Sequence, residues 1–313
     1  MSLSSKKNIL IIAMIILTLV ALGCSKEVEG VVAMVNDQAI SQEIFDEEFQ
    51  ILRESRIRQL GEDALTRIGP DGRTLETELK QILLETLIVE NLIIQDALLN
   101  NISVEDQEVD NRIDDLIVSL GGETAFEEFL ESHDMSREYF IDFTKNDLLF
   151  SKHKNNFISN IIIDKEVAEE YFNENKEDVT ILRASHILVV NEEDGIKILE
   201  ALENGEDFAE LALTESMDSR SAIDGGDLGY FTRGEYTAVQ EFEKAVFDLE
   251  VGEISDLIET EVGYHIIRLN ERKDSFEELE DEIIELLKNQ EYTKYVEELE
   301  NKAEIKVYMD IDS

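Results

Sequence analysis

Proline, cysteine and basic residues are scarce in this chain of 313 residues. Pro70 is the only proline, against roughly 5% in average proteins, so folding of the chain depends little on its own X-Pro isomerisation. Cys24 is the only cysteine, which excludes an internal disulfide. Lysine and arginine number 28 against 73 acidic residues, giving a net charge of −45. This balance argues against nucleic acid as a partner, because phosphate binding needs basic patches.

The first 24 residues have the pattern of a targeting signal. Lys6 and Lys7 form a short basic region, and the apolar run from Ile9 to Leu22 is too short for a comfortable membrane span. The run ends in Ala-Leu-Gly-Cys24, which resembles a bacterial lipoprotein signal that is cleaved before the cysteine, whose thiol is then acylated. Leucine usually stands three residues before that cysteine, where this chain has alanine. An uncleaved anchor and a secretory signal with a chance cysteine are the alternatives.

Two histidines, His186 and His265, lie in runs of apolar and β-branched residues that predict strands. Alternation puts His186 and Leu188 on one face of the first strand, and His265, Ile267 and Leu269 on one face of the second. If the strands are neighbours, the two rings meet on one side of a sheet. The alternative is that both histidines are ordinary, satisfied core residues.

Residues 31–177 read as a short strand, Val31 to Asn36, followed by helices. Ser41 and Thr74 are expected N-caps, and Ser103 with Asp106 is an expected capping box. The helix after Thr74 is apolar nearly all round, which predicts a buried helix.

Seven short motifs between Asp178 and Lys273 together resemble the parvulin family of peptidyl-prolyl cis/trans isomerases. In chain order they are Ala-Ser-His186-Ile-Leu-Val, Phe208-Ala-Glu-Leu-Ala, Ser216-Met-Asp, Gly225-Gly-Asp-Leu-Gly-Tyr-Phe, Phe242-Glu-Lys-Ala-Val-Phe, Gly252-Glu-Ile-Ser and Gly263-Tyr-His-Ile-Ile-Arg-Leu. The helical region, which begins Val-Val-Ala-Met-Val-Asn, is similar to the N-terminal chaperone region of SurA- and PrsA-type foldases.

The resemblance implies an α+β fold, in which a parvulin domain with a small antiparallel sheet flanked by helices is inserted into a helical SurA-N-like chaperone lobe. The expected domains are a lipoprotein signal peptide (1–23), a tether (24–30), the helical chaperone-like lobe (31–177), the parvulin domain (178–273), and a C-terminal helix and strand (274–313) that return to the N-terminal lobe.

The family pattern also implies site residues. Asp218 stands where some parvulins have cysteine and many bacterial ones aspartate, which implies a group that polarises the site and is no nucleophile. Thr260 would join both histidines in a hydrogen-bond network that orients Asp218; a purely structural role for the histidines stays open. The expected catalytic residues are His186, Asp218, Thr260 and His265, the expected proline-binding residues are Leu228, Phe242, Phe247 and Ala238, and the expected lipidation site is Cys24. Gly225, Gly226 and Gly229 are expected to need unusual backbone angles.

Two departures from the family pattern stand out. Many bacterial parvulins have methionine where this chain has Ala238, so one wall of the proline slot is expected to be wider. Phospho-specific parvulins have a basic cluster where this chain is expected to have a short acidic loop, residues 191–195, which argues against phosphoserine-proline substrates.

These residues predict a lipid-anchored foldase on the extracytoplasmic face of a bacterial membrane, which isomerises X-Pro bonds of newly secreted, unfolded polypeptides. The resemblance implies no cofactor and no metal, and it leaves a homodimer open. Two alternatives are a holding chaperone whose parvulin domain has little activity, and a structural lipoprotein that binds the wall.

Overall fold

The computed structural model describes residues 29–70, 72–236 and 239–311. The chain divides into two compact units, Met1–Phe150 with Leu299–Ser313, and Ser151–Glu298. The expected parvulin domain, 178–273, lies inside the second unit, and its limits stay a prediction. Cys24, Ala238 and the whole targeting segment fall outside the described residues.

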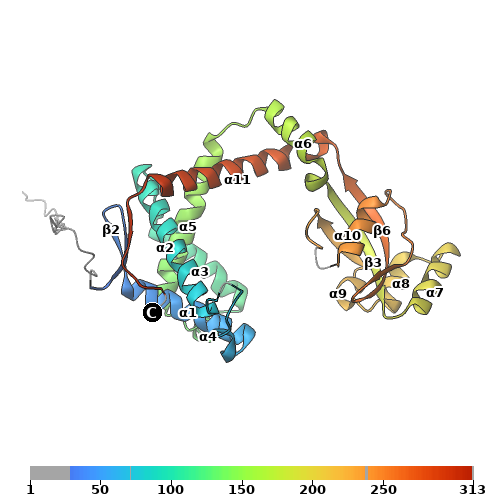
Figure 1. Cartoon of the computed structure of the whole chain (residues 1–313), viewed down its shortest axis with the longest axis horizontal. Coiled ribbons are helices and arrows are strands. Elements are labelled where there is room, and N and C mark those ends of the chain that lie inside the picture. The colour runs from blue at the N-terminus through green and yellow to red at the C-terminus, as the bar shows by residue number, and fades with distance from the viewer. Residues whose placement is uncertain (1–28, 71, 237–238, 312–313) are drawn as a thin grey trace, which may run out of the picture. The chain divides into compact units, whose positions relative to one another are not determined.

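The first unit contains a small sheet and several long helices (Figure 1). Its strands are β1 (Val31–Val35), β2 (Gln38–Ser41) and β7 (Ile305–Val307), antiparallel in the order β2-β1-β7. Strand β7, near the C-terminus, pairs with β1, near the N-terminus. The helices are α1 (Gln42–Leu60), η1 (Glu62–Ala64), α2 (Leu75–Leu99), α3 (Asp106–Leu120), α4 (Glu123–Ser132) and α5 (Arg137–Asn160), of which α5 continues into the second unit.

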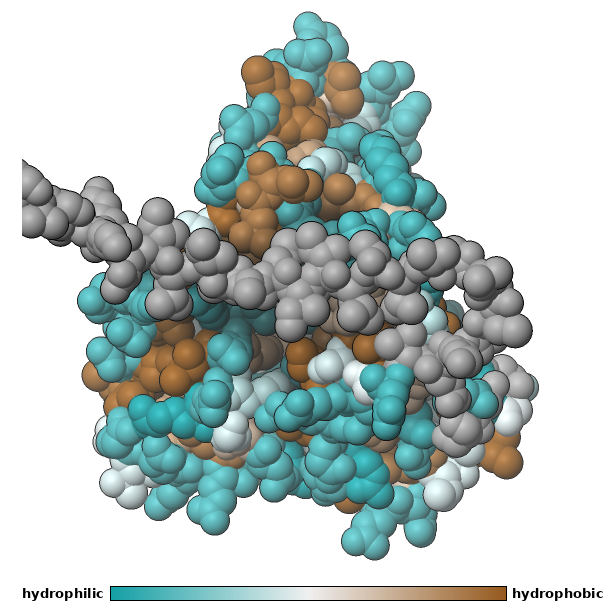
Figure 2. Space-filling view, turned by 90° about the vertical axis from the view of Figure 1, so that its left-hand side faces the viewer, coloured by the Kyte–Doolittle hydropathy of each residue, from teal (hydrophilic) through white to brown (hydrophobic). Residues whose placement is uncertain are grey.

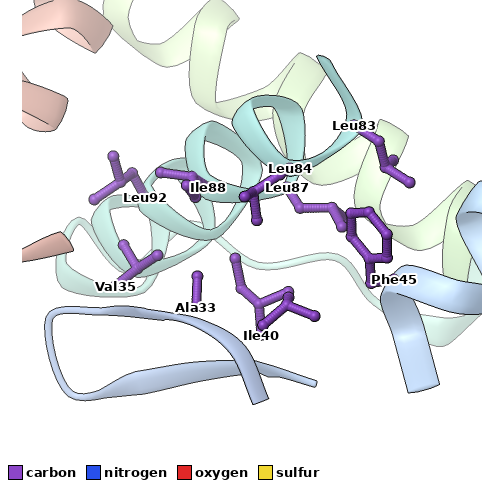
Figure 3. Close-up of a cluster of buried hydrophobic side chains, with 10 residues drawn as sticks. Ala33, Val35, Ile40, Phe45, Leu83, Leu84, Leu87, Ile88 and Leu92 are labelled. Carbon is purple, nitrogen blue, oxygen red and sulfur yellow. The ribbon is translucent and has the colours of Figure 1, made fainter. Parts of the chain in front are cut away.

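The core of this unit forms where α1 and α2 cover the sheet. Figure 3 shows Val35, Ala33 and Ile40 of the two strands facing Leu92, Ile88 and Leu84 of α2. A second cluster joins α3, α4 and α5 through Val109, Ile113, Phe126, Leu130 and Phe140.

The expected caps at Ser41 and Thr74 are confirmed, since their hydroxyls accept from the amides of Ile44 and Thr77. The box expected at Ser103 is wrong. The helix begins two residues later because Glu105 and Glu108 cap each other reciprocally. Burial of α2 on every side is also wrong: Ile82, Leu98 and Leu99 are exposed, although the buried residues between Leu79 and Ala97 occupy more than half of its circumference.

The second unit is built on a four-stranded antiparallel sheet in the order β4-β3-β6-β5. The strands are β3 (Ile181–Val189), β4 (Asp227–Phe231), β5 (Ile258–Thr260) and β6 (Gly263–Lys273), and the helices are α6 (Lys165–Val179), α7 (Glu192–Glu203), α8 (Phe208–Glu215), α9 (Ser219–Ala222), α10 (Gln240–Asp248) and α11 (Phe276–Lys302), which ends in the first unit.

Helices cover both faces of this sheet (Figure 1). Leu182, Ala184, Ile267 and Leu269 pack on α10, while Ile187, Val189 and Ile266 of the opposite face pack on α7 and α8. The expected α+β architecture, with a small antiparallel sheet flanked by helices, is therefore confirmed. Helices α6 and α11 pack on each other through Ala168, Phe172, Phe276, Leu279 and Ile283.

The acidic segment 191–195 is not a loop. Asn191 caps α7 by accepting from the amide of Asp194, and Glu192, Glu193 and Asp194 form the first turn of the helix. Acidic side chains are favourable there because the helix dipole is positive at its N-terminus.

Among the helices of the described ranges, none combines the length and the apolar character that crossing a membrane requires.

Candidate functional site

The register of the two central strands brings both histidines together. Strands β3 and β6 pair so that His186 lies opposite Ile267 and Leu188 lies opposite His265. Directly opposite residues project on the same face of an antiparallel pair. The two Nδ1 atoms are 3.3 Å apart, and both side chains are buried. The predicted meeting of the two rings is confirmed.

Asp218 lies at the outer end of this pair. Its Oδ2 is 2.8 Å from Nε2 of His186 and accepts a hydrogen bond of 2.6 Å from the hydroxyl of Ser221. Its Oδ1 accepts from the amide of Arg220, because Asp218 is also the N-cap of α9. The sequence prediction missed Ser221; its place three residues after Asp218, on the same turn, is the signal that could have identified it.

Thr260, at the end of β5, closes the other end of the network. Its Oγ1 is 3.0 Å from Nε2 of His265 and 3.1 Å from the carbonyl oxygen of Gly263. The structure therefore joins the four expected catalytic residues into one chain of polar contacts, which runs Asp218, His186, His265 and Thr260.

The charge states along this chain follow from burial and hydrogen bonding. Burial lowers the pKa of His186 against the opposing effect of Asp218, and burial together with the neighbouring His186 lowers the pKa of His265 to about 4. Partial burial would raise the pKa of Asp218, but hydrogen bonds from Ser221 and His186 outweigh it and lower that pKa to about 2. At neutral pH the site thus holds one carboxylate and two neutral imidazoles.

Ionised Asp218 only accepts, so Nε2 of His186 carries the proton and Nδ1 of that neutral ring accepts. Two arrangements of His265 fit the contacts. Its Nδ1 donates to His186 while its Nε2 accepts from the hydroxyl of Thr260, or its Nε2 donates to that hydroxyl, which then donates to the carbonyl oxygen of Gly263. In both arrangements His186 is held in one tautomer and orients the carboxylate from within the sheet.

A buried aromatic ring lies against both histidines. Phe242 of α10 is 1% exposed, and its ring centroid is 5.8 Å from that of His186 and 5.3 Å from that of His265. Tyr236, which the sequence prediction missed, lies 5.1 Å from Phe242. Leu228 of β4 is partly buried against the same cluster. Leu228 and Phe242, two of the expected proline-binding residues, therefore belong to one apolar cluster beside the chain of polar contacts.

Phe247 lies at the margin of this cluster. It is partly buried against it, and its ring centroid is 4.4 Å from the guanidinium carbon of Arg233. The same ring lines a cavity of about 730 Å³ with Arg272 and residues 173–178 of α6.

The glycine-rich turn allows the main chain to approach β3 closely. Gly225, Gly226 and Gly229 all have positive φ, as expected. At Gly226 a Cβ atom would lie 2.3 Å from the carbonyl oxygen of His186, and the Gly226 carbonyl accepts from the amide of His186. A glycine at this position lets the turn hold the His186 main chain in place.

Comparison with known proteins agrees with this geometry. Residues 171–273 match the PPIC-type PPIASE domain family, and residues 3–154 match the SurA-like N-terminal domain family. Within the described ranges, no group of three or more His, Cys, Asp and Glu side chains is arranged to hold a metal ion.

The chain is also similar to individual proteins. It is 30% identical to the foldase protein PrsA of Caldanaerobacter subterraneus subsp. tengcongensis over 273 residues, which covers 84% of this chain and 82% of that protein. It is 34% identical to PrsA of Halalkalibacterium halodurans over 195 residues, covering 60% of this chain and 57% of that protein. A crystal structure of PrsA from Bacillus anthracis has 30% identity, covers 69% of this chain and 93% of that one, and gives a TM-score of 0.33. The chain therefore belongs to the PrsA family of foldases and contains a parvulin-type peptidyl-prolyl cis/trans isomerase domain.

Proposed function

We propose that this foldase isomerises X-Pro bonds of secreted polypeptides at the cluster of Asp218, His186, His265 and Phe242. The observation that carries the proposal is the juxtaposition of an ionised carboxylate, held by neutral histidines, with a buried aromatic ring. Proline rings are apolar, and the amide that must rotate is polar, so a catalyst needs both surfaces side by side.

The chemistry needs no bond to break. Rotation about a peptide bond loses amide resonance, with a barrier of about 18–20 kcal/mol, and unaided X-Pro interconversion takes tens to hundreds of seconds. A catalyst must therefore bind the twisted amide better than the planar forms. The apolar cluster around Phe242 would hold the proline ring out of water.

Asp218 would act on the carbonyl group by its charge. Resonance in the planar amide places negative charge on the carbonyl oxygen, and a nearby carboxylate disfavours that charge. Two unit charges 4 Å apart interact by about 4 kcal/mol at an effective dielectric constant of 20. A change of a few tenths of a charge on the oxygen thus corresponds to about 1 kcal/mol, or roughly five- to tenfold in rate. The histidine chain would hold the carboxylate in position.

The test is isomerisation of a blocked X-Pro peptide by the chain from Ser25 to Ser313, which retains both units. Asp218→Asn keeps the shape and removes the charge, so we expect kcat/KM to fall by about five- to tenfold. Asp224→Asn removes an exposed acid six residues away and is expected to leave the rate unchanged. A folded wild-type chain that accelerates no peptide would exclude isomerisation at this site.

A holding function is supported by a separate observation in the first unit. A cavity of about 640 Å³ is lined by Ile44, Tyr139, Phe143 and Phe150 among several acidic residues. Apolar side chains are also exposed on this unit, including Leu98, Leu99, Val118 and Phe143. Figure 2 shows hydrophobic side chains in separate patches among hydrophilic ones on one face of the molecule. Exposed apolar patches commonly bind other chains.

Holding and isomerisation are separated by a client that contains no proline. If the first unit holds unfolded chains, wild type and Asp218→Asn will suppress aggregation of such a client equally. If wild type suppresses aggregation of this client and Asp218→Asn does not, the result would argue against an independent holding surface in the first unit.

We also propose that Cys24 carries a lipid that anchors the foldase to the extracytoplasmic face of the membrane. Mass spectrometry of the membrane-extracted protein should find acyl chains on Cys24, and Cys24→Ser should release the protein from the membrane. A homodimer is a further proposal from the resemblance, and sedimentation of the purified chain tests it.

A further inference from the structure

We infer that a groove of the first unit, lined by residues of α1, α2 and α5, binds unfolded segments in which lysine or arginine neighbours aromatic or aliphatic residues. Its cavity of about 640 Å³ lies in the range of about 300–1,000 Å³ in which proteins bind ligands, which leaves room for a few side chains of an extended segment. The inference rests on the holding function proposed for the first unit, and it adds a chemical class of client to that function.

The groove follows one side of each of two helices. Tyr139, Phe143 and Phe150 line it from α5, and Ile44 and Glu48 line it from α1. Residues four apart on a helix lie on the same side, so each set forms a stripe along its own helix. The hydroxyl of Tyr139 donates to a carboxylate oxygen of Glu48 at 2.8 Å, which joins the two stripes across the groove.

Apolar side chains of the groove are open to solvent. Ile44 is 50% exposed and Phe143 is 51% exposed. The ring of Phe143 stacks on that of Tyr139, with 6.3 Å between the ring centroids. Single exposed apolar residues are normal, but these lie together in one cavity. They offer a surface that an aromatic or aliphatic side chain of a client would cover, and their rings also attract cations.

The lining is more acidic than the chain as a whole. Seven of its 14 residues are Asp or Glu, against 73 of 313 in the chain. Lys145 also lines the groove, but its Nζ forms an ion pair of 3.3 Å with Asp106 of α3. Charge complementarity therefore favours a cationic occupant, and it disfavours a second copy of this chain, whose net charge is −45.

Two of the acidic side chains, Glu48 and Glu90, are partly withdrawn from water. Burial, together with the carboxylate of Glu48, raises the pKa of Glu90 to about 7. Burial also raises the pKa of Glu48, against the hydrogen bond from Tyr139. In the part of the chain that the structure describes, no lysine or arginine offsets these effects. A cationic side chain of a client would stabilise both carboxylates in their charged form.

The test measures binding of labelled, blocked, proline-free octapeptides to the chain from Ser25 to Ser313 by fluorescence anisotropy at pH 8. Three peptides alternate Phe with Lys, Gln or Glu, and a fourth alternates Ala with Lys. We expect the Lys–Phe peptide to bind about tenfold more tightly than the Gln–Phe and Lys–Ala peptides, with Glu–Phe weakest.

Each other outcome contradicts the inference in a different way. Equal affinity for Lys–Phe and Gln–Phe would overturn selection by charge and leave the holding function intact. Equal affinity for Lys–Phe and Lys–Ala would show that charge alone determines binding. Absence of binding by all four peptides would overturn both the inference and the holding function on which it rests.

A matched pair of double variants locates the binding. Glu48→Gln with Glu90→Gln keeps the shape of the groove and an acceptor for Tyr139, and it should weaken Lys–Phe binding by about tenfold. Asp110→Asn with Asp114→Asn removes the same formal charge from exposed positions of α3, and it should change the affinity by less than about twofold. Equal weakening in both would show that the peptide binds the acidic surface in general, and would overturn the inference.

The pH dependence of binding gives an independent readout. Glu47 and Glu48 of α1 and Tyr139 of α5 lie around Glu90. Ordinary carboxylates and lysines keep their charge between pH 8 and 6, whereas Glu90, with its pKa of about 7, becomes neutral as pH falls. Wild-type affinity for Lys–Phe should therefore fall by about three- to fivefold from pH 8 to 6, and Glu90→Gln should abolish this change. A constant wild-type affinity, or the same change in Glu90→Gln, would refute binding at this groove.

Discussion

The charge states of the site predict that isomerisation changes little with pH between about 7 and 8 and shows no histidine titration at or above pH 6.5. An ordinary histidine, with a pKa near 6.5, is about three-quarters protonated at pH 6. His265, whose pKa is lowered to about 4 by burial and by His186, is about 1% protonated at that pH. Burial lowers the pKa of His186 below the ordinary value as well, and the pKa of Asp218 is about 2. The polar chain therefore keeps its charge between about pH 7 and 8.

Protonation of the imidazoles at lower pH should reduce the rate. A positive imidazolium beside Asp218 weakens the field that the carboxylate exerts on the substrate. We expect kcat/KM to decline with a midpoint below pH 6.5, as His186 and His265, the latter with a pKa of about 4, take up protons.

The measurement is exchange spectroscopy by NMR on a blocked Ala-Pro peptide, which has no titrating group of its own. In the same samples the four histidine ring signals report protonation directly, and His133→Gln removes one of the signals from outside the site to aid assignment. A rate that changes with a midpoint at or above pH 6.5, together with a site histidine titrating there, would refute the reasoning.

The lowered pKa of His265 also predicts how stability depends on pH. Between about pH 6.5 and 4 the unfolded chain binds a proton at this residue that the folded chain does not, so the folded state loses stability as pH falls. A shift of this size corresponds to about 2–4 kcal/mol. His265→Gln cannot titrate, so its free energy of unfolding should change less over this range than that of wild type. Parallel curves for the two proteins would contradict the assigned pKa.

Three further changes test the architecture of the site. Gly226→Ala should destabilise the chain by at least about 3 kcal/mol in urea denaturation, because its Cβ would lie 2.3 Å from a carbonyl oxygen of β3. Gly229→Ala, which has open space around it, should cost about 1–2 kcal/mol because of its positive φ. Equal losses of stability in the two variants would contradict the role of close approach at Gly226. Ser221→Ala should raise the pKa of Asp218 in a carboxyl NMR titration and lower the free energy of unfolding by about 1–2 kcal/mol. It should leave kcat/KM unchanged at pH 7, since the carboxylate stays ionised. A large loss of rate would show that the hydroxyl itself takes part. Phe242→Ala should cost about 3–5 kcal/mol of stability, because the ring is buried, and should raise KM in protein that remains folded; an unchanged KM would place the proline ring elsewhere.

Much of the site could be predicted from the sequence because it depends on short periods and short motifs. Strand alternation placed His186 and His265 on faces that could meet, and the positive φ of the glycine-rich turn follows from its residue type. Asp218 and Phe242 were predicted through the family motif, since nothing in the sequence alone shows that they lie beside the histidines.

Other features depend on which surfaces meet in space. Tyr236 carries no periodic signal, and only the path of the segment before α10 brings it to Phe242. The spacing of Ser221 from Asp218 is that of one helical turn, but only the formation of α9 at this place turns the spacing into a contact. The apolar pattern of α2 predicted burial on every side, but the structure leaves Ile82, Leu98 and Leu99 exposed.

The amino-acid sequence by itself determined the strands around His186 and His265, the face on which each histidine lies and the glycine turn, because these follow from local periods and backbone preferences. The antiparallel parvulin-type sheet was predicted through the family resemblance. Only the tertiary structure decided the protonation of the site, because the pKa values depend on the burial of each ring and on its hydrogen-bond partners.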